Sequence, residues 1–290
     1  MLLTPPVACG ITNNMNISAW LKDATKQLKD IGIDSARLDA ELILSETLRK
    51  PRTYLHAHLD ETIDPRRIDI AYARLDLRKD RVPLAYIVGY KEFYGRKFSV
   101  SPNVLIPRPE SEGMIDLLLE VTASDISNQR TLIDVGTGSG CLGITAKLER
   151  PGINVVLSDI SPQALDVAQA NADSLGANIT TQEQDLLFGQ IEPVDYILAN
   201  LPYVDESWSV SPELRHEPKK ALFAKNGGLA MIFRLIEQAP LCLNDDGWLF
   251  IEADPEQHSQ IITFASNYGF IYQKTRHYCV LLRRRVGAES

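Results

Sequence analysis

The stretch "TLIDVGTGSGCLG", residues 131–143, decides the fold. Residues 131–135 are apolar or β-branched and predict a buried strand, and the segment from 141 to about 149 reads as a helix. Between them stand Gly136, Gly138 and Gly140, which allow a tight turn and let a ligand approach the backbone with no Cβ in the way. The spacing is G-x-G-x-G, not the G-x-G-x-x-G of dinucleotide-binding proteins, and no Lys-Ser/Thr pair closes the loop as in a P-loop.

Strands and helices keep alternating downstream, which predicts an α/β fold with a parallel sheet covered on both faces. Ser161, Pro162 and Gly176 are typical of the cap, the first position and the stop of a helix. The strands expected here are 154–159, 194–200 and 247–254, the helices are 161–176 and 227–243, and segments 270–275 and 278–285 form a closing antiparallel pair.

The residues before this sheet differ in character. Segments opening at Ser18 and at Asp64 carry apolar residues at helical spacing and indicate a small bundle, with a short turn around residues 52–59. The next segment is rich in aromatic and β-branched residues broken by glycine and proline, which predicts a β-hairpin. The predicted organisation is a disordered leader (1–15, with Met15 as an alternative start), a helical-bundle substrate-docking domain (16–82), a β-hairpin linker (83–110) and the sheet domain (111–290).

Composition limits the function. The 290 residues are 44% hydrophobic, enough for a large core, and the net charge of −8 argues against a general nucleic-acid binder. The four cysteines are scattered without a C-x-x-C pair, and His56 and His58 lack a third ligand nearby, so neither disulfides nor a metal site is expected. The chain has no signal peptide and no run of about 18 apolar residues, so we expect a cytoplasmic protein with no membrane span.

Two acidic residues extend the site predicted at the glycine loop. Asp159 ends the second strand, where a carboxylate can accept hydrogen bonds from both hydroxyls of a ribose. Asp185, in "EQDLLF" (183–188), follows a short β-like run and falls where a third-strand loop would meet an adenine edge; a plain surface turn explains it equally well. Together the loop and Asp159 predict a nucleoside ligand. The combination resembles the class I, Rossmann-like, S-adenosylmethionine-dependent methyltransferases.

The stretch "DYILANLPYVDES", residues 195–207, suggests what is methylated. Its Asn200-Leu201-Pro202-Tyr203 resembles the (D/N)-P-P-(Y/F/W) motif of methyltransferases that act on planar nitrogens. The Asn200 side-chain oxygen and the Leu201 carbonyl can accept the two N–H bonds of such a nitrogen, and Tyr203 can stack on the planar group. Leu201 departs from the usual proline, but Pro202 still favours an extended backbone before it.

The wider chain resembles the bacterial release-factor glutamine methyltransferases, which act on the Gly-Gly-Gln loop of class 1 peptide release factors. The stretches that carry the resemblance are "RLDAELIL" (37–44), "PLAYIVGYKEFYGRKFSVSPNVLIPRPESE" (83–112), "LIDVGTGSGCLGI" with "LSDISPQALDVAQANA" (132–144, 157–172), and "YILANLPYV" with "HEPKKALFAKNGGL" (196–204, 216–229). "LIPRPESE" is the most discriminating of them.

The resemblance implies S-adenosylmethionine as cofactor, S-adenosylhomocysteine as product and no metal. The cofactor contacts it implies are Gly136, Thr137, Gly138, Ser139, Gly140, Asp159, Asp185, Leu186 and Asn200. The catalytic residues it implies are Asn200, Pro202 and Tyr203, and the substrate contacts are Asn200, Leu201, Pro202 and Tyr203. At Leu186 a bulkier aromatic residue can stand in the family, which bears on cofactor affinity. Class 1 release factors are the expected partner of a monomer that binds no nucleic acid directly.

Other readings remain open. "NLPY" also resembles the motif of ribosomal RNA adenine dimethylases, so the substrate could be an RNA adenine amino group; the acidic charge, the preceding helical domain and "LIPRPESE" weigh against this. A ribosomal-protein glutamine would require the same chemistry, and a protein that binds cofactor without turnover is a third reading. Arg108 and Glu110 either line the cofactor entrance or pair with each other. His216 either borders the substrate groove or is structural.

Overall fold

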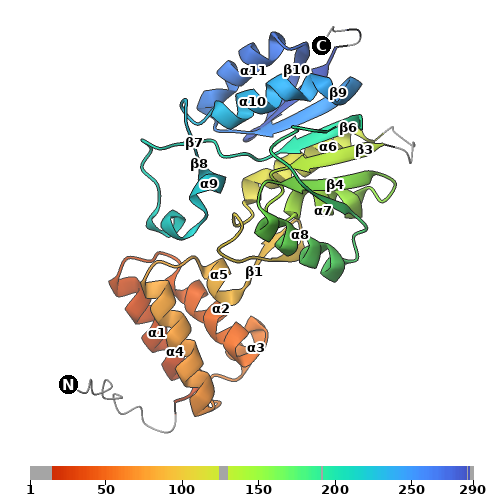
Figure 1. The fold of residues 1–290 in the computed structure, drawn as a ribbon. Helices are drawn as coiled ribbons and strands as arrows, with labels where there is room; N and C mark the ends of the chain where they lie inside the picture. Colours follow the sequence, from red (N-terminus) through yellow and green to blue (C-terminus); the bar gives the residue numbers. More distant parts are fainter. Residues whose placement is uncertain (1–14, 124–129, 191, 286, 288–290) are drawn as a thin grey trace, which may run out of the picture. The chain divides into compact units, whose positions relative to one another are not determined.

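The computed structural model describes residues 15–123, 130–190, 192–285 and 287. Contacts divide the chain into two units between Val88 and Gly89 (Figure 1). The expected leader lies outside the described residues except for Met15, whose carbonyl accepts a hydrogen bond from Ile63 N at 2.9 Å. Among the described residues, no helix is both long and apolar enough to cross a membrane.

The first unit is helical, as predicted. Its helices are α1 (Ile17–Asp30), α2 (Ala36–Leu48), α3 (Arg52–Ala57), α4 (Pro65–Lys79) and α5 (Leu84–Val88). Asn16, not Ser18, caps α1, because its side chain accepts a hydrogen bond from Ala19 N at 2.8 Å. The Asp64 cap of α4 is confirmed by a bond from Arg66 N.

Two short helices of this unit were not predicted. The expected turn at 52–59 contains α3, and α5 occupies residues assigned to the linker. Each buries an apolar side chain, Leu55 and Ile87, in the core that the longer helices form around Trp20. Helices this short depend on tertiary packing more than on local propensity, which explains why periodicity did not reveal them.

The second unit begins with the predicted hairpin, β1 (Tyr90–Phe93) and β2 (Arg96–Ser99). Tyr94 and Gly95 have φ of 48° and 72°, as a two-residue hairpin turn of the primed type requires. Phe93 and Phe98 are fully buried in the core of the sheet unit. The hairpin is therefore part of the packed second unit and not a free linker.

The main sheet confirms the predicted fold class. It has seven strands in the order β10-β11-β9-β6-β3-β4-β5 (Figure 1). Neighbours from β9 through β5 pair in parallel, and β11 pairs antiparallel with β9 and β10. The strands are β3 (Thr131–Val135), β4 (Asn154–Asp159), β5 (Thr180–Glu183), β6 (Val194–Ala199), β9 (Leu243–Glu252), β10 (Phe270–Arg276) and β11 (Cys279–Arg284).

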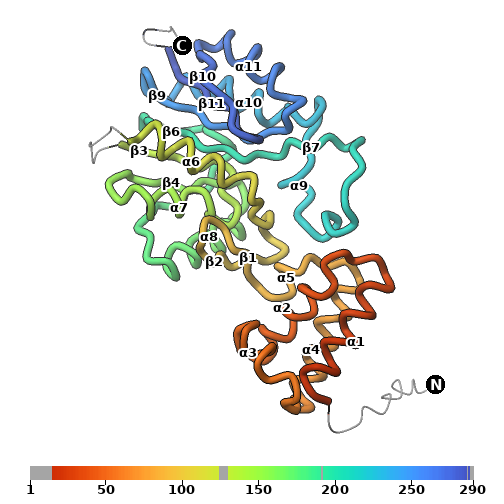
Figure 2. The backbone as a smooth tube through the Cα atoms, turned by 180° about the vertical axis from the view of Figure 1, so that it is seen from behind, coloured from red at the N-terminus to blue at the C-terminus, as the bar shows by residue number. Residues whose placement is uncertain are grey.

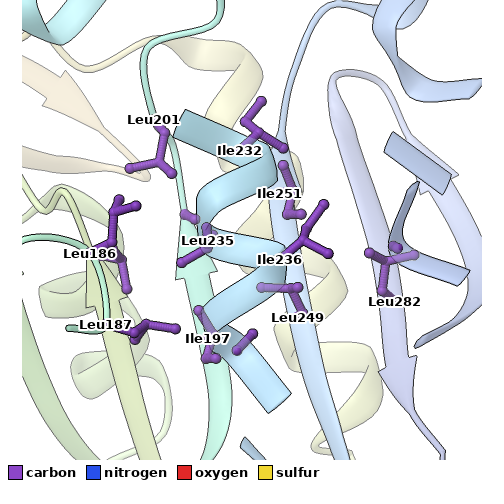
Figure 3. Packing of buried hydrophobic residues seen from close by; sticks show 14 of the residues in the cluster. Leu186, Leu187, Ile197, Leu201, Ile232, Leu235, Ile236, Leu249, Ile251 and Leu282 are labelled. Carbon is purple, nitrogen blue, oxygen red and sulfur yellow. The ribbon is translucent and has the colours of Figure 1, made fainter. Parts of the chain in front are cut away.

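Helices cover both faces, because side chains of the central strands alternate between two cores. In β6, Tyr196 and Leu198 pack with α6 (Glu112–Val121), α7 (Cys141–Glu149) and α8 (Pro162–Leu175). Ile197 and Ala199 pack on the other face with α10 (Ala230–Gln238) and α11 (His258–Ser266). Figure 3 shows the α10 face of this second core, and Figure 2 traces the same backbone from behind. The sequence analysis predicted neither α6 nor α11.

The remaining elements are short. A two-stranded parallel pair, β7 (Val204–Asp205) and β8 (Phe223–Ala224), brackets the long loop after β6. The other short helices are η1 (Pro109–Ser111), η2 (Pro212–His216), α9 (Lys219–Leu222), η3 (Ala239–Leu241) and η4 (Pro255–Gln257).

Gly143→Ala should destabilise the second unit. A Cβ at this position in α7 would lie 2.2 Å from Leu157 Cδ2 and 3.0 Å from Asp134 Cβ, both in the buried core. Overpacking of this kind typically costs about 1–3 kcal/mol. Thermal or denaturant unfolding should show the loss. Gly113→Ala in α6 is the matched control, because its Cβ would meet nothing closer than 3.6 Å and alanine favours helix. Equal stability of the two variants would contradict the close packing of α7.

Candidate functional site

A pocket of about 510 Å³ opens at the carboxyl ends of β3, β4 and β6. Open α/β sheets bind their ligands at this edge. Most of the residues predicted from the sequence line it together: Gly136, Thr137, Gly138, Ser139, Asp159, Asp185, Leu186, Asn200, Leu201 and Pro202. Gly140 and Tyr203 do not line it.

The glycine loop has the backbone that only glycine adopts readily. Gly136, Gly138 and Gly140 have φ of 69°, 54° and 80°. A Cβ on Gly136 would come within 3.0 Å of Leu201 Cδ2, and one on Gly140 would come within 2.6 Å of Ile144 Cδ1. Gly136 and Gly138 therefore face the pocket, whereas Gly140 is required by packing at the start of α7.

Asp134 fixes the glycine loop through two hydrogen bonds. It is buried at the end of β3, and its Oδ2 accepts hydrogen bonds from Thr137 Oγ1 at 2.6 Å and from Gly143 N at 2.9 Å. Burial raises the pKa of this carboxyl to about 6, against the two hydrogen bonds, which lower it. Sequence reasoning missed this role, although an acid directly before the glycine loop was a visible signal.

Asp159 presents a carboxylate fixed by two backbone donors. Its Oδ2 accepts from Gly138 N at 3.0 Å, and its Oδ1 accepts from Ser161 N at 2.9 Å. A carboxylate offers about four lone-pair sites, so each oxygen can still accept a hydroxyl of a ligand. The ribose contact stays a prediction, for which these lone pairs are the atoms required.

Asp185 and Leu186 lie side by side on the pocket wall but differ in environment. The Asp185 side chain is 41% exposed and pairs with Arg234 at 2.9 Å. Leu186 is buried with φ of 55°, and its carbonyl accepts from Gln184 Nε2 at 2.8 Å. Gln184 and Ser139 also line the pocket. The buried Gln184 Oε1 has no hydrogen-bond partner among the described residues.

Asn200 leaves β6 with its amide anchored on one side. Its Nδ2 lies 3.0 Å from Ser111 Oγ, to which it donates a hydrogen bond. The side-chain oxygen is thereby left for a ligand in the pocket. Leu201 is buried against Gly136, which joins this segment to the glycine loop.

Tyr203 is held by its backbone and by its hydroxyl. Gln257 Nε2 donates to the Tyr203 carbonyl at 2.8 Å, and a Cβ on Gly228 would lie 1.9 Å from the same oxygen. Tyr203 Oη lies 3.5 Å from Glu252 Oε1, and burial together with that carboxyl raises the pKa of the phenol.

Arg108 has both of the roles considered from the sequence, but with a different partner. This residue lines the pocket and also pairs, but its partner is the buried Glu217 at 2.6 Å, not Glu110. Glu217 accepts a second hydrogen bond from Ile106 N at 3.1 Å. The loop that carries Glu217 is thus fastened to the segment before α6. His216 is exposed and does not line the pocket.

Several residues of the site were not found from the sequence: Asp134, Ser111, Asn171, Glu217, Glu252 and Gln257. Asn171, on α8, donates to Ser99 O at 3.0 Å and to Ser139 O at 2.9 Å, so it ties the hairpin to the glycine loop. Glu252 ends a parallel strand beside the one that carries Asn200, and that position was the available signal. Ser111, Asn171, Glu217 and Gln257 make contacts across long sequence separations, which no local pattern reveals.

Comparison with known proteins agrees with this geometry. Two family models match the chain: the PrmC N-terminal domain over residues 19–89 and the methyltransferase small domain over residues 111–281. A solved T. thermophilus 16S rRNA methyltransferase in complex with AdoMet and guanosine has the same fold. Its TM-score is 0.51 at 18% identity, over 68% of this chain and 49% of that one.

Curated relatives match over most of their length. The release factor glutamine methyltransferase of Koribacter versatilis is 39% identical over 83% of this chain and 89% of its own. The release factor glutamine methyltransferase of Aliivibrio fischeri is 32% identical over 90% and 93%. The chain therefore belongs to the release factor glutamine methyltransferase family of S-adenosylmethionine-dependent methyltransferases.

Proposed function

We propose that this enzyme transfers a methyl group from S-adenosylmethionine to the side-chain amide nitrogen of the glutamine in the Gly-Gly-Gln loop of class 1 peptide chain release factors. One observation carries the assignment of the acceptor: Asn200 donates its amide N–H to Ser111, so its oxygen remains to accept an N–H from the substrate. The family relationship supports the protein substrate.

The pocket fits the cofactor, which supplies a sulfonium methyl group when bound. Its volume of about 510 Å³ lies within the roughly 300–1,000 Å³ usual for small-molecule sites. Asp159 accepts the ribose hydroxyls, Gly136 and Gly138 allow close approach to the backbone, and Asp185 with Leu186 borders the adenine.

The residues after β6 position the amide nitrogen of the substrate glutamine. The lone pair of an amide is delocalised, so the nitrogen is a poor nucleophile. Asn200 Oδ1 and the Leu201 carbonyl accept its two N–H bonds and direct the lone pair along the line to the methyl group. Pro202 keeps Leu201 extended, and Tyr203 stacks on the planar group. The nitrogen becomes acidic only after it gains the methyl group, so no strong base is needed.

The remaining expectations follow from this substrate. We infer that the helical unit docks the release factor, that the enzyme acts as a monomer in the cytoplasm, and that it binds no nucleic acid directly. An RNA adenine is the rival substrate. The net charge of −8 disfavours it, and the likeness to an rRNA methyltransferase is one of fold alone.

Labelled S-adenosylmethionine tests the proposal directly. We expect label on a cognate class 1 release factor, no label on the same factor with the loop glutamine replaced, and none on bulk ribosomal RNA. Label on RNA alone would overturn the protein substrate, and label on a ribosomal protein would redirect it to another glutamine.

Asn200→Ala should lower turnover by about 100-fold or more, the size of effect seen when one group that stabilises a transition state is removed. Cofactor binding, measured by calorimetry, should remain detectable. Asn267→Ala, the same change on the exposed end of α11, is the control. Turnover that is unchanged in Asn200→Ala would exclude the proposed mechanism.

The main effect of Asp159→Ala should be weaker cofactor binding. The loss of charged hydrogen bonds to ribose and of the brace on Gly138 N should raise the Kd by about 10- to 100-fold. Asp166→Ala, an exposed carboxylate on α8, should leave the Kd unchanged. Equal titration curves for the two variants would contradict the ribose role of Asp159.

A further inference from the structure

A buried carboxyl lies behind the pocket and has no part in the steps above. Strand register pairs Ala199 with Ile251, so the residues that follow, Asn200 and Glu252, leave the sheet side by side. Glu252 is 1% exposed, and its Oε2 has no hydrogen-bond partner among the residues described. A buried carboxyl that lacks full hydrogen bonding lowers stability, so its presence calls for a reason.

The neighbours of Glu252 are the residues that hold the substrate-binding segment. Burial raises the pKa of Glu252 to about 7; hydrogen bonding by Ser111, Tyr203 and Asn200 opposes that rise, and the charge of Glu110 adds to it. Asn200 Nδ2 lies 3.0 Å from Ser111 Oγ, and Tyr203 Oη lies 3.5 Å from Glu252 Oε1. Ser111 and the Asn200 amide thus contact each other, and both lie close to the Glu252 carboxyl.

The ionised carboxylate of Glu252 determines which groups donate and which accept in the hydrogen bonds of Ser111 and Asn200. A carboxylate can only accept hydrogen bonds, and Ser111 has a single O–H to give. Once that O–H points to Glu252, Ser111 has only lone pairs for Asn200. The Asn200 amide must then turn its NH₂ toward Ser111, as observed, and its oxygen away from it. A neutral group at position 252 could donate to Ser111 instead, and both orientations of the amide would be satisfied.

We propose that Glu252 is a positioning residue that acts on the Asn200 amide, both directly and through Ser111, to hold the amide oxygen directed at the substrate nitrogen. The inference rests on the proposed function, because it assigns Asn200 to the methyl acceptor. The other titratable groups that face Glu252 are Glu110 on η1, Tyr203 after β6, Cys141 on α7 and Cys279 on β11. Burial raises the pKa of the phenol and of both thiols, so these three stay neutral near pH 7.

Steady-state kinetics give the first test. Glu252→Gln keeps the shape but removes the acceptor-only group, so kcat should fall about 3- to 10-fold while the cofactor Kd stays constant. Ser111→Ala should also lower kcat, and the two losses should not multiply in the double variant, because both changes disturb hydrogen bonds of the same amide. Glu120→Gln is the matched control; this carboxylate is exposed and pairs with Lys274 and Arg276.

The pH profile separates positioning from a structural role. In the wild type, kcat should rise between pH 6 and pH 8 with a midpoint near 7, as Glu252 ionises and fixes the amide. In Glu252→Gln, kcat should not change over this pH range. Asp134, whose pKa is also raised, is intact in both proteins, so its titration does not explain the difference. A wild-type kcat and profile in Glu252→Gln would overturn the proposal.

A nuclear magnetic resonance titration tests the proposal without turnover. The side-chain NH₂ signals of Asn200, assigned by their loss in Asn200→Ala, should shift with a midpoint near pH 7 in the wild type. The shift should be absent from Glu252→Gln. Asn200 signals whose chemical shifts do not change with pH in the wild type would overturn the inference. This outcome does not depend on whether Glu252→Gln folds. If the wild type methylates no release factor, the proposed function fails and this titration alone decides the role of Glu252.

Discussion

The loop at the centre of the site has its shape because one buried carboxyl, Asp134, accepts two hydrogen bonds. Thr137 Oγ1 and Gly143 N both donate to the same oxygen, at 2.6 Å and 2.9 Å. The first bond fixes the loop on β3, and the second fixes the first turn of α7, where a negative charge also favours the helix dipole. Gly143 is needed because a Cβ there would reach into Leu157 and Asp134 itself. The approach of helix to strand, the turn of the loop and the position of the pocket thus depend on one side chain.

The burial of carboxyl groups at this site lowers the stability of the fold by an amount that depends on pH. The pKa of Asp134 is raised to about 6 and that of Glu252 to about 7, because both carboxyls are buried at strand ends that flank β6. A group with a raised pKa binds protons more tightly in the folded chain than in the unfolded one. Its contribution to stability is complete at low pH and is lost as the pH rises through the raised pKa. The site therefore keeps buried acceptors near neutral pH at the expense of folding free energy.

The sequence sufficed for the parts of the molecule that local patterns determine. The stretch 131–143, the alternation after it and the Ser161 cap of α8 all predicted what is observed. The pairing of Arg108 shows where such reasoning stops. Glu110 and Glu217 are both acids, and only the folded loop decides that the second, 109 residues away, is the partner. For the same reason Ser111 could not be placed beside Asn200, whereas the predicted strand that ends at Glu252 did offer a signal for that residue.

The two halves of the site are joined by an apolar contact. Gly136 packs under Leu201, whose Cδ2 would lie 3.0 Å from a Cβ at that position, and both residues belong to the pocket wall. A methyl transfer in line requires that donor and acceptor hold a fixed distance and angle. In the mechanism that we propose, polar groups orient the two ends: Asp159 orients the ribose, and Asn200, anchored through Ser111, orients the amide. In the same proposed mechanism, Leu201 sets the spacing between the two ends, so the reaction would depend on packing as much as on hydrogen bonds.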